Sequence, residues 1–309
     1  MDLYPFLFLI CLATIGVCVF YASASVGAFF NFGGMGMNLM KKDELKEILQ
    51  NPVISIDDYK NRIEKIEKFF AKKHKNNFQA FYRGDKKDTE VTAKLFKENS
   101  IEQENTYFEQ WKKDCKENDE KYCKCENELM CLAAMQHEEK TQTRLLDFTK
   151  DPLVALRFAC GRENSNAEKK VTFFYTNYLN ENETFEKSQW FMKLVKCDDL
   201  SGFSKDERNF LKEDYFIEVP LEFEKIKRQK GCFLFMGNTK EINKRKFFAK
   251  KVGHSLCPHI GRGRQYEGYV GELTIASEYV ETIRNELDKN SKYNSDYLFC
   301  KEKQNEKTN

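Results

Sequence analysis

The sequence predicts an α+β fold, with one mixed domain that follows a single apolar N-terminal segment. Segments of helical and of strand periodicity follow one another irregularly, without the strand–helix–strand alternation of a parallel sheet. The chain of 309 residues is long enough to bury a core, and no internal repeat divides it. With 32% charged and 41% hydrophobic residues, the composition excludes a disordered chain and a polytopic membrane protein.

Charge and cysteine content narrow the class of protein further. The net charge of +2 creates no global attraction to nucleic acid or to an anionic membrane. Of the 11 cysteines, two lie in the apolar N-terminal segment, and the rest are an odd number at irregular spacing. This pattern does not indicate a disulfide framework, so we expect free thiols and a reducing compartment.

The N-terminal segment has two interpretations. Residues 3–40 carry no charge, and residues 3–30 are mostly apolar, which exceeds the roughly 20 residues that cross a bilayer. The alternative is a signal peptide cleaved after the small residues 22–24, which would give a secreted protein. Because Lys41 and Lys42 follow the run and only Asp2 precedes it, we expect residues 1–40 to be a membrane anchor and linker, with the domain facing the cytoplasm.

Two helices are predicted ahead of the domain, in a helical lead-in of residues 41–75. Residues 43–50 predict a short helix that Asn51-Pro52 ends. Residues 57–74 carry apolar residues at helical spacing, with a lysine-rich opposite face. The domain itself is predicted over residues 76–302, and the polar residues 303–309 form a tail.

Within the domain, periodicity and turn residues define the elements in order. Pro152 stands where a first-turn proline belongs and opens a helix over residues 152–159. Strands are predicted over residues 78–84, 171–178, 215–219, 231–236 and 269–276. Helices or helical turns are predicted over residues 92–98, 105–116, 126–137, 186–196, 241–251 and 278–287. The lysine-rich stretch 224–230 is predicted to be a solvated surface.

The first candidate site residue is Arg83, in the sequence Phe81-Tyr82-Arg83-Gly84. An aromatic strand ends there in an arginine, whose planar fork binds phosphate or carboxylate, and in a glycine, which permits close approach of a ligand or backbone. The alternative is an arginine paired with a structural carboxylate before a turn.

A second group of candidates follows in residues 128–159. Gln136, His137, Arg144 and Asp147 stand among apolar runs, where polar groups need partners or a ligand. Arg144 and Asp147 would otherwise form an ion pair that pins the loop, and His137 would cap its helix. We expect Arg83, His137, Arg144 and Asp147 to converge in one polar cleft.

These segments together resemble the FRG domain, which is named for its Phe/Tyr-Arg-Gly motif. The resemblance rests on FYRG, on ELMCLAAMQH and on TRLLDFTKDPLVALRFA, followed by RQKGCF and GELTIASEYVETIRNEL, in the family's order. It covers residues 76–300. Met135, Gln142 and Phe148 depart from the residues usual in the family. The resemblance implies a bacterial or phage protein of the kind found near defence genes.

The strand of residues 81–84 is also similar to the first strand of ADP-ribosyltransferases, where the arginine holds NAD. This similarity implies NAD as a possible substrate, with Tyr82, Arg83, Gly84, Gln136, Gln229 and Gly231 as candidate binding residues. The candidate catalytic residues are Arg83, His137, Arg144, Asp147 and Glu267. A carboxylate is required to stabilise the oxocarbenium-like centre as nicotinamide leaves, and Glu267 and Glu272 are candidates, although neither lies in a Glu-x-Glu motif.

The sequence is compatible with three functions. The first is a membrane-tethered effector that cleaves NAD or transfers ADP-ribose to an unknown macromolecular target, as a toxin or in phage defence. The second is a module that binds a nucleotide or phosphorylated ligand, or a protein partner, without turnover. The third is a buried polar network with no ligand. The cysteines at 115, 123, 125 and 131 lack the spacing of a zinc site, and we expect no metal.

The topology can be tested directly. A reporter fused after Asn309 is expected to be active in the cytoplasm, with residues 1–40 still attached, because the positive charges follow the apolar run. Recovery of a mature protein beginning at Ser25 outside the membrane would contradict this expectation.

Overall fold

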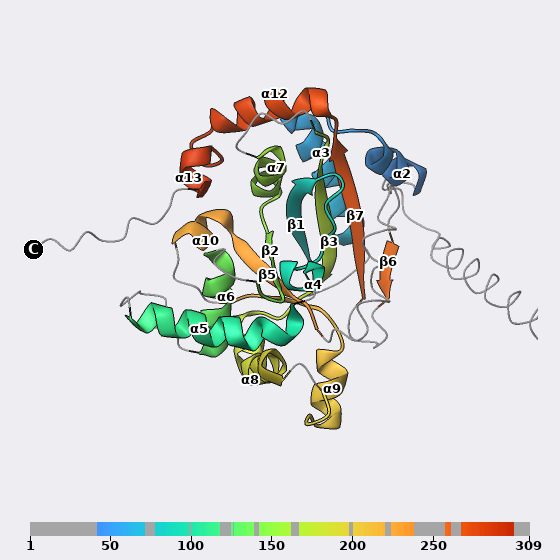
Figure 1. The fold of residues 1–309 in the computed structure, drawn as a ribbon. Coiled ribbons are helices and arrows are strands. Elements are labelled where there is room, and N and C mark those ends of the chain that lie inside the picture. Colours follow the sequence, from blue (N-terminus) through green and yellow to red (C-terminus); the bar gives the residue numbers. More distant parts are fainter. Residues whose placement is uncertain are drawn as a thin grey trace, which may run out of the picture. The chain divides into compact units, whose positions relative to one another are not determined.

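Seven strands form one antiparallel sheet, in the order β4-β5-β2-β1-β3-β7-β6 (Figure 1).

The computed structural model describes residues 42–71, 78–98, 100–117, 125, 127–138, 142–161, 167–197, 200–219, 224–237, 257–260 and 267–299. All of these lie in one unit, Met40–Asn309. Helices and strands alternate irregularly within it, so the α+β class expected from the sequence is confirmed.

The strands match the predicted ones except at two positions. β2 and β6 were not predicted as strands, and β2 lies in the interior of the sheet between β5 and β1. The strands are β1 (Phe78–Lys86), β2 (Leu145–Thr149), β3 (Lys169–Asn177), β4 (Tyr215–Ile217), β5 (Gly231–Phe235), β6 (Cys257–Ile260) and β7 (Glu267–Ile275).

The described helices include every predicted one except that at residues 241–251, which lies outside the described residues. Three short helices, α9, α10 and α13, were not predicted. The helices are α2 (Lys42–Gln50), α3 (Ile56–Ala71), α4 (Lys94–Lys97), α5 (Glu104–Glu117), α6 (Glu128–His137), α7 (Pro152–Cys160), α8 (Glu181–Cys197), α9 (Lys205–Leu211), α10 (Glu224–Gln229), α12 (Ser277–Asp288) and α13 (Ser295–Phe299).

The predicted membrane anchor of residues 1–40 lies outside the described residues. Within the part of the chain that the structure describes, no helix is both long enough and apolar enough to cross a bilayer.

Side-chain caps fix where the two helices beside the candidate site begin. The Asn127 side chain accepts a hydrogen bond from the Met130 amide at the start of α6. Asp151 does the same for Leu153 in α7, and Pro152 occupies the first turn, as the sequence predicted. These caps satisfy amides that a helix leaves without partners, so both helices start at defined residues.

Two hydrophobic cores lie on one face of the sheet. The first joins α2, α3, α7 and α12 to β1, β3 and β7, and the second joins α5, α6 and α8 to β2, β4 and β5. A smaller aromatic core, which includes Phe81, Phe148 and Phe216, covers the opposite face. The β1–β2 boundary therefore separates two independently packed halves of the same face.

The backbones of β1 and β2 separate at this boundary. β1 and β3 pair continuously from Phe78↔Asn177 to Lys86↔Lys169, whereas β1 and β2 are paired at Tyr82↔Thr149 alone. Beyond that pair, Arg83 and Gly84 have no ladder partners on β2. The sheet thus opens at its middle, next to the sequence that resembles the FRG motif.

Gly84 allows α7 to approach β1 closely. A Cβ atom at this position would lie 2.0 Å from the Ala155 carbonyl oxygen and 2.3 Å from the Ala159 amide nitrogen. Both atoms belong to the helix backbone, so a side chain would force the helix off the strand.

Gly84→Ala is expected to lower the free energy of unfolding by about 1–3 kcal/mol, because backbone atoms of α7 must move. Urea unfolding of the full chain measures this loss. Gly202→Ala is the matched control, since a Cβ there meets no atom within 4 Å. Equal midpoints for the two variants would show that the close approach is unimportant.

Candidate functional site

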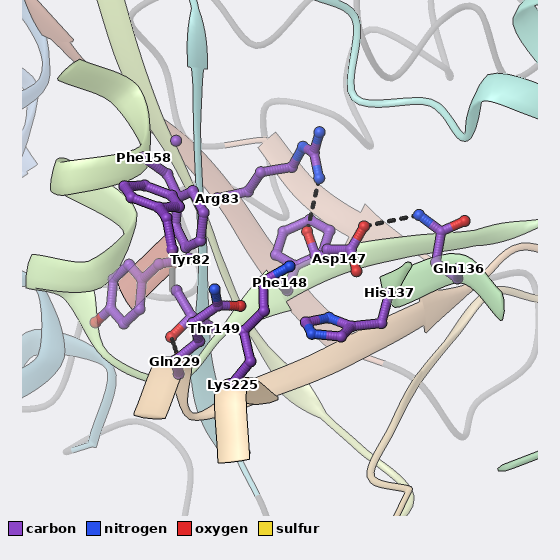
Figure 2. A pocket seen from close by; sticks show the side chains of 12 residues that line it. Tyr82, Arg83, Gln136, His137, Asp147, Phe148, Thr149, Phe158, Lys225 and Gln229 are labelled. Atoms are coloured by element: carbon purple, nitrogen blue, oxygen red, sulfur yellow. Dashed lines mark hydrogen bonds between the residues drawn. The ribbon is translucent and has the colours of Figure 1, made fainter. Parts of the chain in front are cut away.

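A pocket of about 380 Å³ opens where β1 and β2 separate (Figure 2). Strands β1 and β2 supply Tyr82–Gly84 and Asp147–Thr149, and four helices close the remaining sides. The helical lining residues are Gln136 and His137 of α6, Phe158 of α7, Lys225 and Gln229 of α10, and Phe299 of α13. The volume is in the range of pockets that bind small molecules.

The Asp147 carboxylate is fixed at the side of the pocket by a short relay. The Gln136 side-chain amide donates to Asp147 Oδ2 at 2.7 Å, and the Thr143 hydroxyl donates to Gln136 Oε1 at 2.6 Å. The second bond sets which end of the amide faces Asp147. The carboxylate is therefore held in one orientation before any ligand arrives.

His137 and Lys225 point into the same space as Asp147. Figure 2 shows the His137 ring beside the Asp147 carboxylate and the Lys225 side chain extending toward Phe148. Lys225 is half-buried, and no ion pair or hydrogen bond joins it to another described residue. A carboxylate, an imidazole and an ammonium group thus share one small pocket.

Arg83 crosses the gap between the two strands. Its Nη1 donates to the Asp147 carbonyl oxygen at 2.7 Å, and Nε and Nη2 donate to the Asp85 carboxylate at 2.8 and 3.1 Å. The guanidinium replaces the ladder bonds that β1 and β2 lack there. Arg83 therefore pairs with a carboxylate of its own strand, Asp85, as the alternative interpretation of the sequence expected. Arg83 also lines the pocket.

Aromatic rings form the apolar walls. Tyr82, Phe148, Phe158 and Phe299 line the pocket, and Phe158 and Phe299 meet edge to face with centroids 5.1 Å apart. The Tyr82 hydroxyl donates to the Glu67 carboxylate of α3. Burial, together with this neighbouring negative charge, raises the pKa of the Tyr82 phenol well above its ordinary value, so it stays a neutral donor.

Gln229 lies at the base of the pocket and Gly231 does not line it. The Thr149 hydroxyl donates to the Gln229 carbonyl at 2.5 Å, and the Gln229 side chain donates to the Leu298 carbonyl at 2.7 Å. Gly231 pairs with Thr149 at the start of β5. Gln229 thus holds α10 and α13 against the sheet.

Arg144 lies outside the pocket, so the expectation that it would join Arg83, His137 and Asp147 is wrong. Its side chain is fully buried and pairs with Glu104 of α5, with Nε and Nη2 at 2.7 and 2.6 Å from Oε2. The Arg144 amide also donates to Glu104 at 2.8 Å. The sequence placed Arg144 close to Asp147, but its charge is used within the core.

Glu272 of β7 does not line the described part of the pocket. Glu272 accepts hydrogen bonds from Lys170 at 2.8 Å and from Thr172 at 3.3 Å, in the row of the sheet that also contains Arg83. Glu267 begins β7, and its side chain lies outside the described side chains. Asp147 is thus the carboxylate that the described part of the pocket contains.

Five lining residues were not among the candidates: Phe148, Thr149, Phe158, Lys225 and Phe299. Phe148 and Thr149 directly follow the candidate Asp147, Lys225 falls in a stretch predicted to be solvated, and Phe158 and Phe299 look like ordinary core residues in the sequence. The only signal was the position of Lys225 just before the segment that resembles the family's downstream motif. Among the described residues, no group of three or more potential metal ligands is present.

The fold and the pocket define an α+β domain with a pocket where β1 and β2 separate. Residues 78–168 match the model of the FRG domain, and the chain therefore contains an FRG domain, as the sequence motifs indicated. No curated protein matches the chain. No solved structure matches it either.

The matched residues contain part of the pocket. Residues 78–168 include β1, α6, β2 and α7, which carry Arg83, His137 and Asp147. Lys225, Gln229 and Phe299 lie beyond them. The pocket is therefore completed by a part of the chain that the family model does not cover.

Glu104→Ala is expected to lower the free energy of unfolding by about 3–5 kcal/mol, because it leaves the Arg144 guanidinium charged in the core. Thermal unfolding of the full chain measures this. Glu64→Ala, which removes an exposed partner of Lys68, is the control and is expected to leave the midpoint unchanged. A small loss for Glu104→Ala would show that Arg144 reaches water or another anion.

Proposed function

We propose that the FRG domain binds a nucleotide of the NAD class in the pocket between β1 and β2. The observation that supports this most is the combination of a fixed carboxylate, an ammonium group without a described partner, and aromatic walls. Carboxylates accept hydrogen bonds from ribose hydroxyls, a lysine binds phosphate, and aromatic rings stack on a base. These are the three chemical parts of a nucleotide.

The reaction that fits these groups is cleavage of the N-glycosidic bond. The C1′–N bond breaks, the electron pair leaves with nicotinamide, and positive charge develops on the ribose. Asp147, held by Gln136, stabilises this oxocarbenium-like centre. Water or a nucleophile of a macromolecular target then adds to C1′ and loses its proton, for which His137 is the adjacent base.

In this proposal Arg83 is a positioning residue. Its guanidinium donates to Asp85 and to the Asp147 carbonyl, so its fork is engaged by the protein. It sets the position of Asp147 and of the strand opening. The phosphate contact that the sequence suggested for Arg83 is assigned to Lys225.

Binding without turnover is the second candidate. The pocket has a single described carboxylate, and one of its oxygens is occupied by Gln136. A site that only recognises a nucleotide needs the same lysine and aromatic groups. The two candidates differ in whether nicotinamide is released.

We also propose that the domain acts at a membrane, tethered by residues 1–40 and facing the cytoplasm. This rests on the uncharged apolar run and on Lys41 and Lys42 after it. A tethered enzyme of this class would act as an effector on a nearby macromolecule.

The test is incubation of the full chain with NAD, with nicotinamide release and NAD affinity measured separately. Lys225→Ala is expected to weaken NAD binding about 10- to 100-fold, through loss of a charge-assisted contact. Lys227→Ala on the same helix is the matched control, because Lys227 is exposed beside Glu224. Asp147→Asn is expected to reduce nicotinamide release by at least about 100-fold with a smaller change in affinity.

Three results separate the candidates. Binding of NAD without release of nicotinamide supports the recognition module over the enzyme. Equal affinities for the two lysine variants remove Lys225 from the site. Failure of NAD, ADP-ribose and AMP to bind overturns the proposal as a whole.

A further inference from the structure

Two aromatic rings of the pocket wall belong to none of the three described hydrophobic cores. Phe158 of α7 and Phe299 of α13 are both half-buried, and both line the pocket. We propose that they form a ring subsite, which binds the second base of a dinucleotide whose reacting ribose lies at Asp147. This inference rests on the proposed function, and it names the ligands of that class that the pocket prefers.

The two rings contact each other and leave apolar surface toward the pocket. Their centroids are 5.1 Å apart and their planes meet at 82°, which is an edge-to-face contact. Both side chains keep part of their surface exposed, and both line the pocket. A flat base that covers this ring surface removes it from water, so the subsite favours an aromatic ligand group.

Neighbouring polar groups fix the Phe299 ring in place. The Arg157 guanidinium lies over it, with Cζ 5.5 Å from the ring centroid. Arg157 Nη2 pairs with Asp288 at 3.0 Å, and Nη1 donates to the Gly161 carbonyl. At the start of α13, the Ser295 amide donates to Asp288 Oδ1 at 3.2 Å. The ring is therefore positioned before a ligand binds, which reduces the ordering entropy lost on binding.

The order of chemical groups along the pocket matches that of a dinucleotide. In the view of Figure 2, the Phe158 ring lies to one side of Lys225 and the Asp147 carboxylate lies to the other. Lys225 and Gln229 are one turn apart on α10, and the Gln229 side chain donates to the Leu298 carbonyl of α13 at 2.7 Å. Ring, ammonium and carboxylate thus correspond to base, phosphates and reacting ribose.

The donors beside the rings are engaged within the protein. The Arg157 donors go to Asp288 and to the Gly161 carbonyl. The Gln229 side-chain amide donates to the Leu298 carbonyl. Stacking requires only a flat π-face, whereas discrimination between bases requires hydrogen bonds to their edges. The ring subsite therefore accepts adenine and hypoxanthine alike.

Binding of ADP-ribose and of ribose 5-phosphate to the full chain tests the ring subsite. The two ligands differ by the adenylate half, and neither carries the bond to nicotinamide that the chain would cleave. The wild-type chain is expected to bind ADP-ribose at least about 10-fold more tightly than ribose 5-phosphate. It is expected to bind the hypoxanthine analogue of ADP-ribose within about threefold of ADP-ribose itself, because stacking tolerates different bases.

Substitutions of the two rings assign the difference to stacking. Phe299→Ala is expected to weaken ADP-ribose binding about 10-fold and to leave ribose 5-phosphate binding unchanged, whereas Phe299→Tyr keeps a ring and retains the affinity. Phe158→Ala, on a different helix, is a second variant with the same expected effect. Tyr297→Ala is the matched control on α13, because Tyr297 is exposed against Arg228 and does not line the described part of the pocket. Urea unfolding of each variant checks that the fold is retained.

The outcomes separate the ring subsite from the proposed function. Equal affinity of the wild-type chain for ADP-ribose and ribose 5-phosphate would overturn the ring subsite and leave the nucleotide pocket standing. Equal losses for both ligands in the Phe299→Ala chain would show that the ring only supports the pocket wall, and would overturn the subsite as well. A strong preference for adenine over hypoxanthine would contradict recognition by stacking. Failure of both ligands to bind would overturn the proposed function, and this inference with it.

Discussion

The hydrogen bonds of Arg83 hold together two halves of the sheet whose backbones separate. β1 and β2 share one ladder pair, Tyr82↔Thr149, and the guanidinium bridges the next position by donating to the Asp147 carbonyl. Asp85 neutralises the charge and fixes the plane of the fork. The Arg83 side chain supplies a hydrogen bond between β1 and β2 where the backbone ladder has none. This bond stabilises the separation of the two strands, and the pocket lies in that separation.

The four residues of the motif each have a separate physical role at this opening. Phe81 stacks on Phe216 in the core of the opposite face, with ring centroids 4.2 Å apart. Tyr82 forms a pocket wall and bonds to Glu67, Arg83 joins the strands, and Gly84 lets α7 approach. Each residue of the motif therefore contributes to the opening through a different contact.

Two arginines of similar sequence context illustrate how burial decides the use of a charge. Arg83 lies at the edge of a pocket, where Asp85 and a carbonyl share its donors. Arg144 is fully buried, and its desolvation is offset by an ion pair and a hydrogen bond with the Glu104 carboxylate and by a cation–π contact with Phe235. Arg83 thus joins the two strands beside the pocket, whereas Arg144 joins α5 to β2 within the core that α6 shares.

The α+β class, the FRG domain and most helices and strands could be predicted from the sequence alone. Periodicity located α3 because its apolar residues recur at helical spacing, and Asp151-Pro152 located the start of α7. The motifs also selected Arg83, His137 and Asp147, which line the pocket.

Tertiary structure decided what depends on partners that are distant in the chain. β2 was not predicted because five residues with an aspartate at the centre show no strand pattern, and only pairing with β5 and β1 makes Leu145–Thr149 a strand. Glu104 pairs with Arg144 across 40 positions of sequence, and α10 places Lys225 in the wall of the pocket from a stretch that looks solvated. Local sequence patterns indicate which residues favour a helix or a strand. The partner of a charged side chain depends instead on which groups the fold places around it.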